Sequence, residues 1–159
     1  MNDPYLKQRP IFVVDDNEDD YEAIARAFKK VGLYNPITLC TTGKMALGAL
    51  KHEGPAEPQE QVENPALILL DLNMPGMDGL QVLKKIKADE KLKIIPVVIW
   101  TTSSNKYDIN ACYSNGANAY MQKPVAFEHL LESAKRLKEY WFETAFLPAD
   151  KKHHKDVPS

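Results

Sequence analysis

Short apolar runs alternate along the chain with stretches whose apolar residues recur at helical spacing. Five runs have the length and the aliphatic or β-branched content of strands: residues 11–14, 37–40, 66–70, 94–100 and 119–122. The other stretches place an apolar residue every three or four positions, as one face of a helix does: residues 21–31, 42–50, 80–86, 105–116 and 127–141. This alternation predicts a doubly wound α/β domain, in which five helices cover a sheet of five parallel strands.

The stretch 66–79 predicts where such a domain presents its chemistry. Its apolar run stops at Asp71, turn-forming pairs follow at 75–76 and 78–79, and helical spacing resumes at Leu80. Asp71 therefore lies at a junction between a strand and a helix, on the rim where open α/β sheets bind ligands. A single acid in this place is also a common turn former or helix cap, so the other strand ends bear on its role.

Polar residues follow three of the other strands as well. Asp15 and Asp16 follow the first strand, Thr101 the fourth and Lys123 the fifth. In the flavodoxin-like strand order 2-1-3-4-5 the first and third strands are neighbours, so Asp15, Asp16 and Asp71 converge in one crevice. Crowded carboxylates raise one another's pKa unless a cation compensates them. Oxygen ligands select a hard ion, and a site that retains several waters favours Mg²⁺ over Ca²⁺.

Two other motifs that use such acids do not fit. An EF-hand loop beginning at Asp15 requires glycine at its sixth position and glutamate at its twelfth, where this chain has Asp20 and Arg26. A phosphatase of the haloacid dehalogenase type carries Asp-x-Asp after its strand, and here Asn73 replaces the second acid of that motif. Neither class of site is expected.

In their order and spacing these residues resemble the receiver domain of two-component response regulators. The resemblance covers residues 9–140 and rests on Val13-Val14-Asp15-Asp16, Leu69 to Pro75 with Asp78-Gly79, Thr101, Tyr120 and Lys123-Pro124. It implies that Asp71 is a nucleophile that accepts a phosphoryl group from a phosphohistidine of a sensor histidine kinase. We predict a receiver domain over residues 9–142 and a C-terminal extension over 143–159.

The same resemblance implies a metal site. Asp16 and Asp71 would ligate Mg²⁺ directly, together with the backbone carbonyl of Asn73, while Asp15 would act mostly through water. Phosphoryl transfer depends mainly on positioning and charge neutralisation, and the metal and Lys123 would supply both. An ordinary exposed lysine remains the alternative for Lys123.

A switch is implied as well. Thr101 would hydrogen-bond a phosphoryl oxygen, and Tyr120 would turn inward and alter the face made by the fourth helix, the fifth strand and the fifth helix. The resemblance also implies a cis bond between Lys123 and Pro124. A helix N-cap is the alternative for Thr101, and plain strand packing is the alternative for Tyr120.

Composition excludes several other classes of protein. The chain has 159 residues, of which 44% are hydrophobic and 26% charged, as expected of one domain with a proper core. Its net charge of −2 leaves no basic footprint for nucleic acid, and no apolar run is long enough to span a membrane. The first residues lack the pattern of a signal peptide. Cys40 and Cys112 are predicted to be buried free thiols, in keeping with the cytoplasm.

The residues beyond the receiver are too few for a DNA-binding or enzymatic output domain. We therefore expect a stand-alone regulator that is not an enzyme and acts through a protein contact. The acidic loop 53–65 and the segment Trp-Phe-x-Thr-Ala-x-Leu-Pro at 141–148 resemble the regulators paired with cyanobacterial phytochrome histidine kinases. The alternative is an adaptor with the receiver fold that docks without switching. An enzyme acting on an external substrate ranks third.

The C-terminal aromatic segment predicts self-association. If the last helix continues with α-helical spacing, Phe142 and Phe146 leave the apolar stripe and, with Leu147, form an exposed apolar patch. A symmetric homodimer is the commonest way to cover such a patch. The alternative is that this segment folds back onto its own domain.

Overall fold

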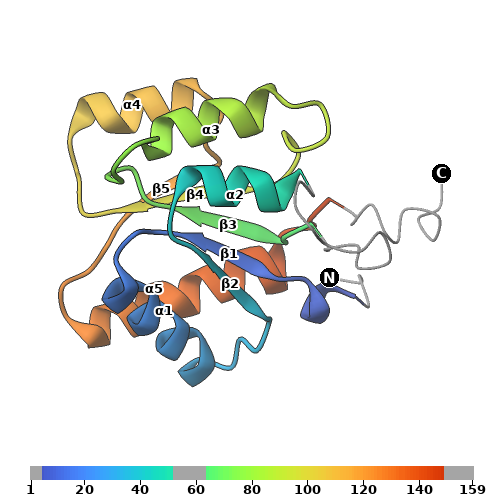
Figure 1. Cartoon of the computed structure of the whole chain (residues 1–159). Coiled ribbons are helices and arrows are strands. Elements are labelled where there is room, and N and C mark those ends of the chain that lie inside the picture. Colours follow the sequence, from blue (N-terminus) through green and yellow to red (C-terminus); the bar gives the residue numbers. More distant parts are fainter. Residues whose placement is uncertain (1–4, 52–63, 149–159) are drawn as a thin grey trace.

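The computed structural model of the chain describes residues 5–51 and 64–148 (Figure 1). Most of the predicted acidic loop, and the chain after Pro148, lie outside the described residues. Five parallel strands form one sheet in the order β2-β1-β3-β4-β5, which confirms the predicted topology. The strands are β1 (Ile11–Val14), β2 (Ile37–Cys40), β3 (Leu67–Leu70), β4 (Val97–Thr101) and β5 (Ala119–Gln122).

Helices cover both faces of this sheet, as predicted. Figure 1 shows α1 and α5 on one face and α2, α3 and α4 on the other. Their bounds are α1 (Glu18–Lys30), α2 (Gly43–Leu50), α3 (Gly79–Ala88), α4 (Lys106–Ser114) and α5 (Phe127–Leu137). A short 3₁₀ helix, η1 (Leu6–Gln8), precedes β1, and a π-helix, η2 (Lys138–Thr144), follows α5. No helix within the described residues combines the length and the hydropathy needed to cross a bilayer.

The central strands are apolar without interruption because both of their faces are buried. In β1, Phe12 and Val14 pack with α2 and α3, whereas Ile11 and Val13 pack with α1 and α5. Alternate residues of a strand point to opposite faces, so a doubly covered strand has no solvent side. Cys40 is fully buried as a free thiol, as predicted.

The loops at the carboxyl ends of β1, β2 and β3 each lead into a helix whose N-terminus is capped by a side chain. Asn17 caps α1, Thr42 caps α2, and Asp78 forms a capping box with Gln81 at the start of α3. Gly79 is required at that start because a Cβ there would collide with the carbonyl of Asp71. The loop after β3 is therefore folded tightly against the third strand end.

The fourth strand is shorter than predicted. The apolar run begins at Ile94, but pairing with β3 begins only at Val97, and Ile94 is 52% exposed. The apolar run therefore begins before the buried, paired part of the strand. The strand ends at Thr101, so this residue belongs to the sheet.

The end of the last helix corrects one prediction. In η2 hydrogen bonds close five residues apart, as from the Ala145 N–H to the Tyr140 carbonyl at 2.7 Å. This wider winding shifts Phe142 from its α-helical direction toward the side of the helix that carries Leu137. Phe142 is 7% exposed within the cluster that contains Leu137. The prediction that Phe142 has no place in the core is wrong, because it extended α-helical spacing through a more loosely wound segment.

The residues after η2 divide between core and solvent. Leu147 packs against the same apolar cluster as Phe142, and a guanidinium nitrogen of the buried Arg9 donates to the carbonyl of Pro148 at 2.9 Å. Phe146 remains 81% exposed. Most of this segment therefore folds back onto its own domain, and one aromatic side chain is left outside.

Candidate functional site

Three carboxylates meet at the carboxyl ends of β1 and β3. The N–H of Asp71 donates to the carbonyl of Val14 at 3.0 Å, so the parallel ladder itself sets the end of β3 beside Asp15. One oxygen each from Asp15, Asp16 and Asp71 lie within 4.8 Å of one another. Asp15 and Asp71 are buried and Asp16 is exposed. The structure thus brings together the acids that the strand order predicted to converge.

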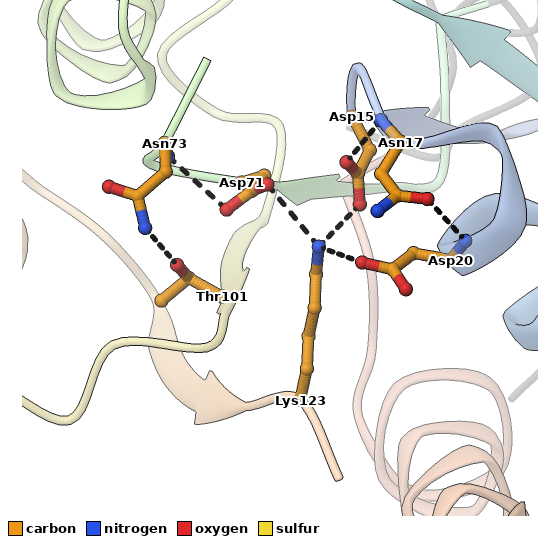
Figure 2. A network of polar contacts seen from close by, with 7 residues as sticks. All are labelled: Asp15, Asn17, Asp20, Asp71, Asn73, Thr101 and Lys123. Atoms are coloured by element: carbon orange, nitrogen blue, oxygen red, sulfur yellow. Dashed lines mark hydrogen bonds and ion pairs between the residues drawn. The ribbon is translucent and has the colours of Figure 1, made fainter. Parts of the chain in front are cut away.

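Lys123 reaches into this acidic cluster from the end of β5 (Figure 2). Its Nζ lies 2.6 Å from Asp15 Oδ2 and 3.3 Å from Asp71 Oδ2, and its side chain is only 8% exposed. The alternative of an ordinary exposed lysine is therefore excluded. No peptide bond among the described residues is cis, so the cis bond to Pro124 implied by the resemblance is not found, and Lys123 enters the crevice from a trans bond.

The ion pairs shift the pKa values in the crevice. Burial alone would lower the pKa of Lys123, but hydrogen bonds to Asp15 and Asp20 and the charges of Asp15 and Asp71 outweigh burial and raise it above the ordinary value. Burial raises the pKa of Asp15, against the hydrogen bonds that this carboxylate accepts from Lys123 and from the Asn17 N–H. Lys123 is therefore a fixed positive charge, whereas burial makes ionisation of the Asp15 carboxyl less favourable than in water.

Thr101 and Asn73 form the opposite wall of the crevice. Thr101 is fully buried, and its Oγ1 accepts a hydrogen bond of 3.4 Å from Asn73 Nδ2. The N–H of Asn73 donates to Asp71 Oδ1 at 3.3 Å. Asn105, and not Thr101, caps α4, so the helix-cap alternative for Thr101 is excluded. One hydrogen bond therefore links the Thr101 hydroxyl to Asn73, in the loop that carries Asp71.

Tyr120 connects β5 to the loop that follows Thr101. Its hydroxyl donates to the Ser103 carbonyl at 2.9 Å, while its ring packs against the cluster under α2, α3 and α4. Burial raises its pKa. Two residues further on, Gln122 Nε2 donates to the Thr102 carbonyl at 3.0 Å. Strand packing alone therefore does not describe Tyr120, because its hydroxyl also holds the β4–α4 loop.

Asp20 is a further residue of the crevice, and its contact with Lys123 was not predicted from the sequence. Its Oδ2 lies 2.9 Å from Lys123 Nζ, and its backbone N–H donates to the Asn17 side chain that caps α1. A signal was present in the sequence, because a cap at Asn17 makes Asp20 the third residue of a helix that starts at the crevice. Only the structure shows that Lys123 reaches this far.

The residues present suit a divalent cation. Carboxylate oxygens are the ligands that hard ions prefer, and Asp15, Asp16 and Asp71 offer three of them in one small volume. Burial raises the pKa of Asp15 and the charge of Asp71 adds to that effect, so a cation bound beside Asp15 would favour its ionised form. The exposure of Asp16 leaves room for the waters that Mg²⁺ retains.

Two curated proteins are similar to this chain over most of its length. The probable methanogenesis regulatory protein FilR2 of Methanothrix harundinacea is 40% identical over 140 residues, which cover 87% of this chain and 84% of FilR2. The response regulator Rcp1 of Synechocystis sp. is 34% identical over 149 residues, which cover 94% of this chain and 99% of Rcp1.

Solved structures share the fold at similar identity. The phosphorylated cyanobacterial phytochrome response regulator RcpA has a TM-score of 0.81 at 37% identity, covering 89% of this chain and 99% of the RcpA chain. The Mn²⁺-bound form of Rcp1 has a TM-score of 0.79 at 34% identity, with the same coverage. A model of the response regulator receiver domain matches residues 11–135, from the start of β1 into α5. Because this match contains every residue of the acidic crevice, the chain belongs to the response regulator receiver domain family.

Proposed function

We propose that this chain is a single-domain response regulator that accepts a phosphoryl group on Asp71 from a sensor histidine kinase. The observation that carries the proposal is the 3.3 Å contact between a buried Asp71 and the ammonium of Lys123, beside two further acids. A carboxylate is sufficient as a nucleophile, so the buried ammonium beside it calls for a further role. The fixed cation next to it suits the negative oxygens of an incoming phosphoryl group.

The reaction needs few groups. A carboxylate oxygen of Asp71 forms the new P–O bond while the P–N bond to the kinase histidine breaks and its electron pair stays on nitrogen. Lys123 neutralises the phosphoryl oxygens, and the Thr101 hydroxyl donates to one of them in place of its present contact with Asn73. A divalent cation held by Asp15, Asp16 and Asp71 would add charge neutralisation at the same oxygens.

The test is whether wild-type protein gains the mass of one phosphoryl group after incubation with acetyl phosphate and Mg²⁺. A second measurement follows the phosphoryl group of a phosphorylated histidine kinase. Its loss from the kinase and its gain by this chain would identify a histidine kinase as the donor. An unchanged mass under both conditions would favour the alternative, an adaptor that docks without switching. The presence of Asp71, Lys123 and Thr101 together in one crevice supports the switch.

Phosphorylation is proposed to act through the β4–α4 loop. A phosphoryl group attracts Thr101, and the loop that follows Thr101 is held by Tyr120 and Gln122 of β5. A shift at the site therefore reaches the surface of α4, β5 and α5, and this surface is the proposed contact for a partner. We place the protein in the cytoplasm, where histidine kinases present their phosphohistidines.

A phytochrome-type kinase is the proposed partner. The similarity to RcpA, a phytochrome response regulator, supports it across 99% of that chain. The comparable similarity to FilR2, a probable regulator of methanogenesis, makes a second kinase class the relevant competitor in the test. Competition between a phytochrome kinase and other kinases, measured as initial rates of phosphotransfer, would decide between them.

Mg²⁺ should stabilise the folded domain. A ligand that binds only the native state adds about 2.7 kcal/mol when its concentration is 100 times its dissociation constant. Asp16→Asn should remove most of the rise in melting temperature, because Asp16 contributes an exposed ligand oxygen without supporting the core. Glu18→Gln, an exposed acid two residues away, is the control and should keep the rise. No rise for the wild type at millimolar Mg²⁺ would contradict the metal site.

Self-association is proposed to use Phe146. Burial of Phe142 leaves Phe146, 81% exposed, and Tyr140, 56% exposed, as the aromatic surface at the C-terminal side of α5. Phe146→Asp should convert a dimer to a monomer in size exclusion with light scattering, because burying a phenylalanine contributes roughly 1.5–3 kcal/mol per copy. Met45→Asp, at a half-exposed position of α2 on the opposite face, should leave the dimer intact. A monomeric wild type at tens of micromolar would contradict the proposal.

A further inference from the structure

Lys123 has a carboxylate partner that no role in phosphoryl transfer requires. Its Nζ lies 2.9 Å from Asp20 Oδ2, which is closer than the 3.3 Å to Asp71 Oδ2. In Figure 2 Asp20 approaches the ammonium from the side opposite Asp71, with Asp15 between them. The ammonium is therefore shared among three acids, and the phosphoacceptor is the most distant of the three.

The position of Asp20 is set by the start of α1. Asn17 caps the helix, and its side chain accepts the Asp20 N–H at 3.1 Å, so Asp20 occupies the first turn, facing the crevice. Its side chain is 40% exposed, whereas those of Lys123 and Asp71 are each 8% exposed. Asp20 is also absent from the group of oxygens that could hold a metal ion. Its contact with Lys123 is thus separate from the metal ligands.

We infer that Asp20 is a positioning residue that holds Lys123 back from Asp71 and so limits the rate of phosphoryl uptake. The inference rests on the proposed function. When acetyl phosphate reacts, the P–O bond to acetate breaks, acetate leaves with the electron pair, and a P–O bond forms to Asp71. Negative charge then accumulates on oxygens beside Asp71. Lys123 must move toward those oxygens, and its ion pair with Asp20 opposes that movement.

The variant Asp20→Asn tests the inference. It keeps the size of the side chain and removes the charge, so uptake from acetyl phosphate should become about fivefold faster, as expected for the loss of one partly exposed ion pair. The gain should shrink as salt is added, because the exposed carboxylate is screened. Asp20→Glu keeps the charge and should restore a rate near that of the wild type.

Asp19→Asn is the matched control. Asp19 is the preceding residue of the same helical turn, it is exposed, and it is not among the described carboxylates within ion-pair distance of Lys123. Asp19→Asn removes one negative charge from the first turn of α1, as Asp20→Asn does. It should nevertheless leave the uptake rate unchanged. Melting curves confirm that each variant is folded.

Two results would overturn the inference. One is an unchanged or slower rate for Asp20→Asn while the wild type is phosphorylated normally. The other is an equal acceleration by Asp19→Asn, which would assign the effect to general charge. Failure of the proposed function itself looks different, because the wild type would then form no adduct at all.

Discussion

Asp71→Asn is expected to lower the rate of phosphoryl uptake by a factor on the order of 10⁴ to 10⁶, because the amide cannot serve as the nucleophile. The side chain keeps its shape, and its remaining oxygen can still accept the hydrogen bond from the Asn73 N–H. Intact-mass measurement after incubation with acetyl phosphate and Mg²⁺ gives the fraction of protein that carries a phosphoryl group. Uptake at the wild-type rate would assign the nucleophile to another residue.

The fold should survive this substitution. Lys123 loses one of its three ion pairs, but the repulsion between Asp71 and Asp15 also disappears. The two effects oppose each other, so the loss in free energy of unfolding should stay below the roughly 3–5 kcal/mol that breaking a buried ion pair otherwise costs. Glu90→Gln, which removes an exposed acid paired with Lys93, is the control that should preserve both stability and uptake.

Phe142→Ala is expected to have the largest effect on stability among substitutions in the C-terminal segment. The ring is buried in the cluster that includes Leu6, Leu33 and Leu137, so its removal leaves a cavity where the first and last segments of the domain meet. Truncating a buried phenylalanine costs about 3–5 kcal/mol. Urea unfolding measured by circular dichroism gives this loss as a lower midpoint at constant slope.

Phe146→Ala provides the matched control for that experiment. It is the same substitution four residues later, at a side chain that is 81% exposed. Its effect on the unfolding of the monomer should stay within about 0.5 kcal/mol. Equal losses at the two positions would contradict the burial of Phe142 through the π-helix.

Hydrophobic periodicity was sufficient for the fold because this sheet is covered on both faces. β1 and β3 lie between two layers of helices, so their sequences are apolar throughout, whereas each helix shows apolar residues on one side only. The boundaries were less certain. Ile94 is apolar, yet it is half exposed and lies outside the ladder of β4, so the apolar run extends beyond both the core and the backbone pairing.

The acidic crevice could be predicted because topology brings strand ends together. Each residue of the crevice lies at the end of a strand or within two residues after it, and parallel strands end on one edge of the sheet: Asp15, Asp16, Asp71, Thr101 and Lys123. Asp20 follows no strand. It meets Lys123 across 103 positions of the chain, through the length of one lysine side chain and the direction of one helical turn. Such a contact has no periodic signature.

Strand and helix order, the acidic rim of the sheet and the family resemblance could all be predicted from the amino-acid sequence, because each depends on local spacing or on the ends of apolar runs. Two features depend on the folded chain: which carboxylates share the ammonium of Lys123, and which phenylalanine of the C-terminal segment is buried. Both outcomes depend on small changes in direction, namely the reach of a side chain across the crevice and the wider winding of η2 that turns Phe142 inward and leaves Phe146 in solvent. These directions arise from packing between distant segments.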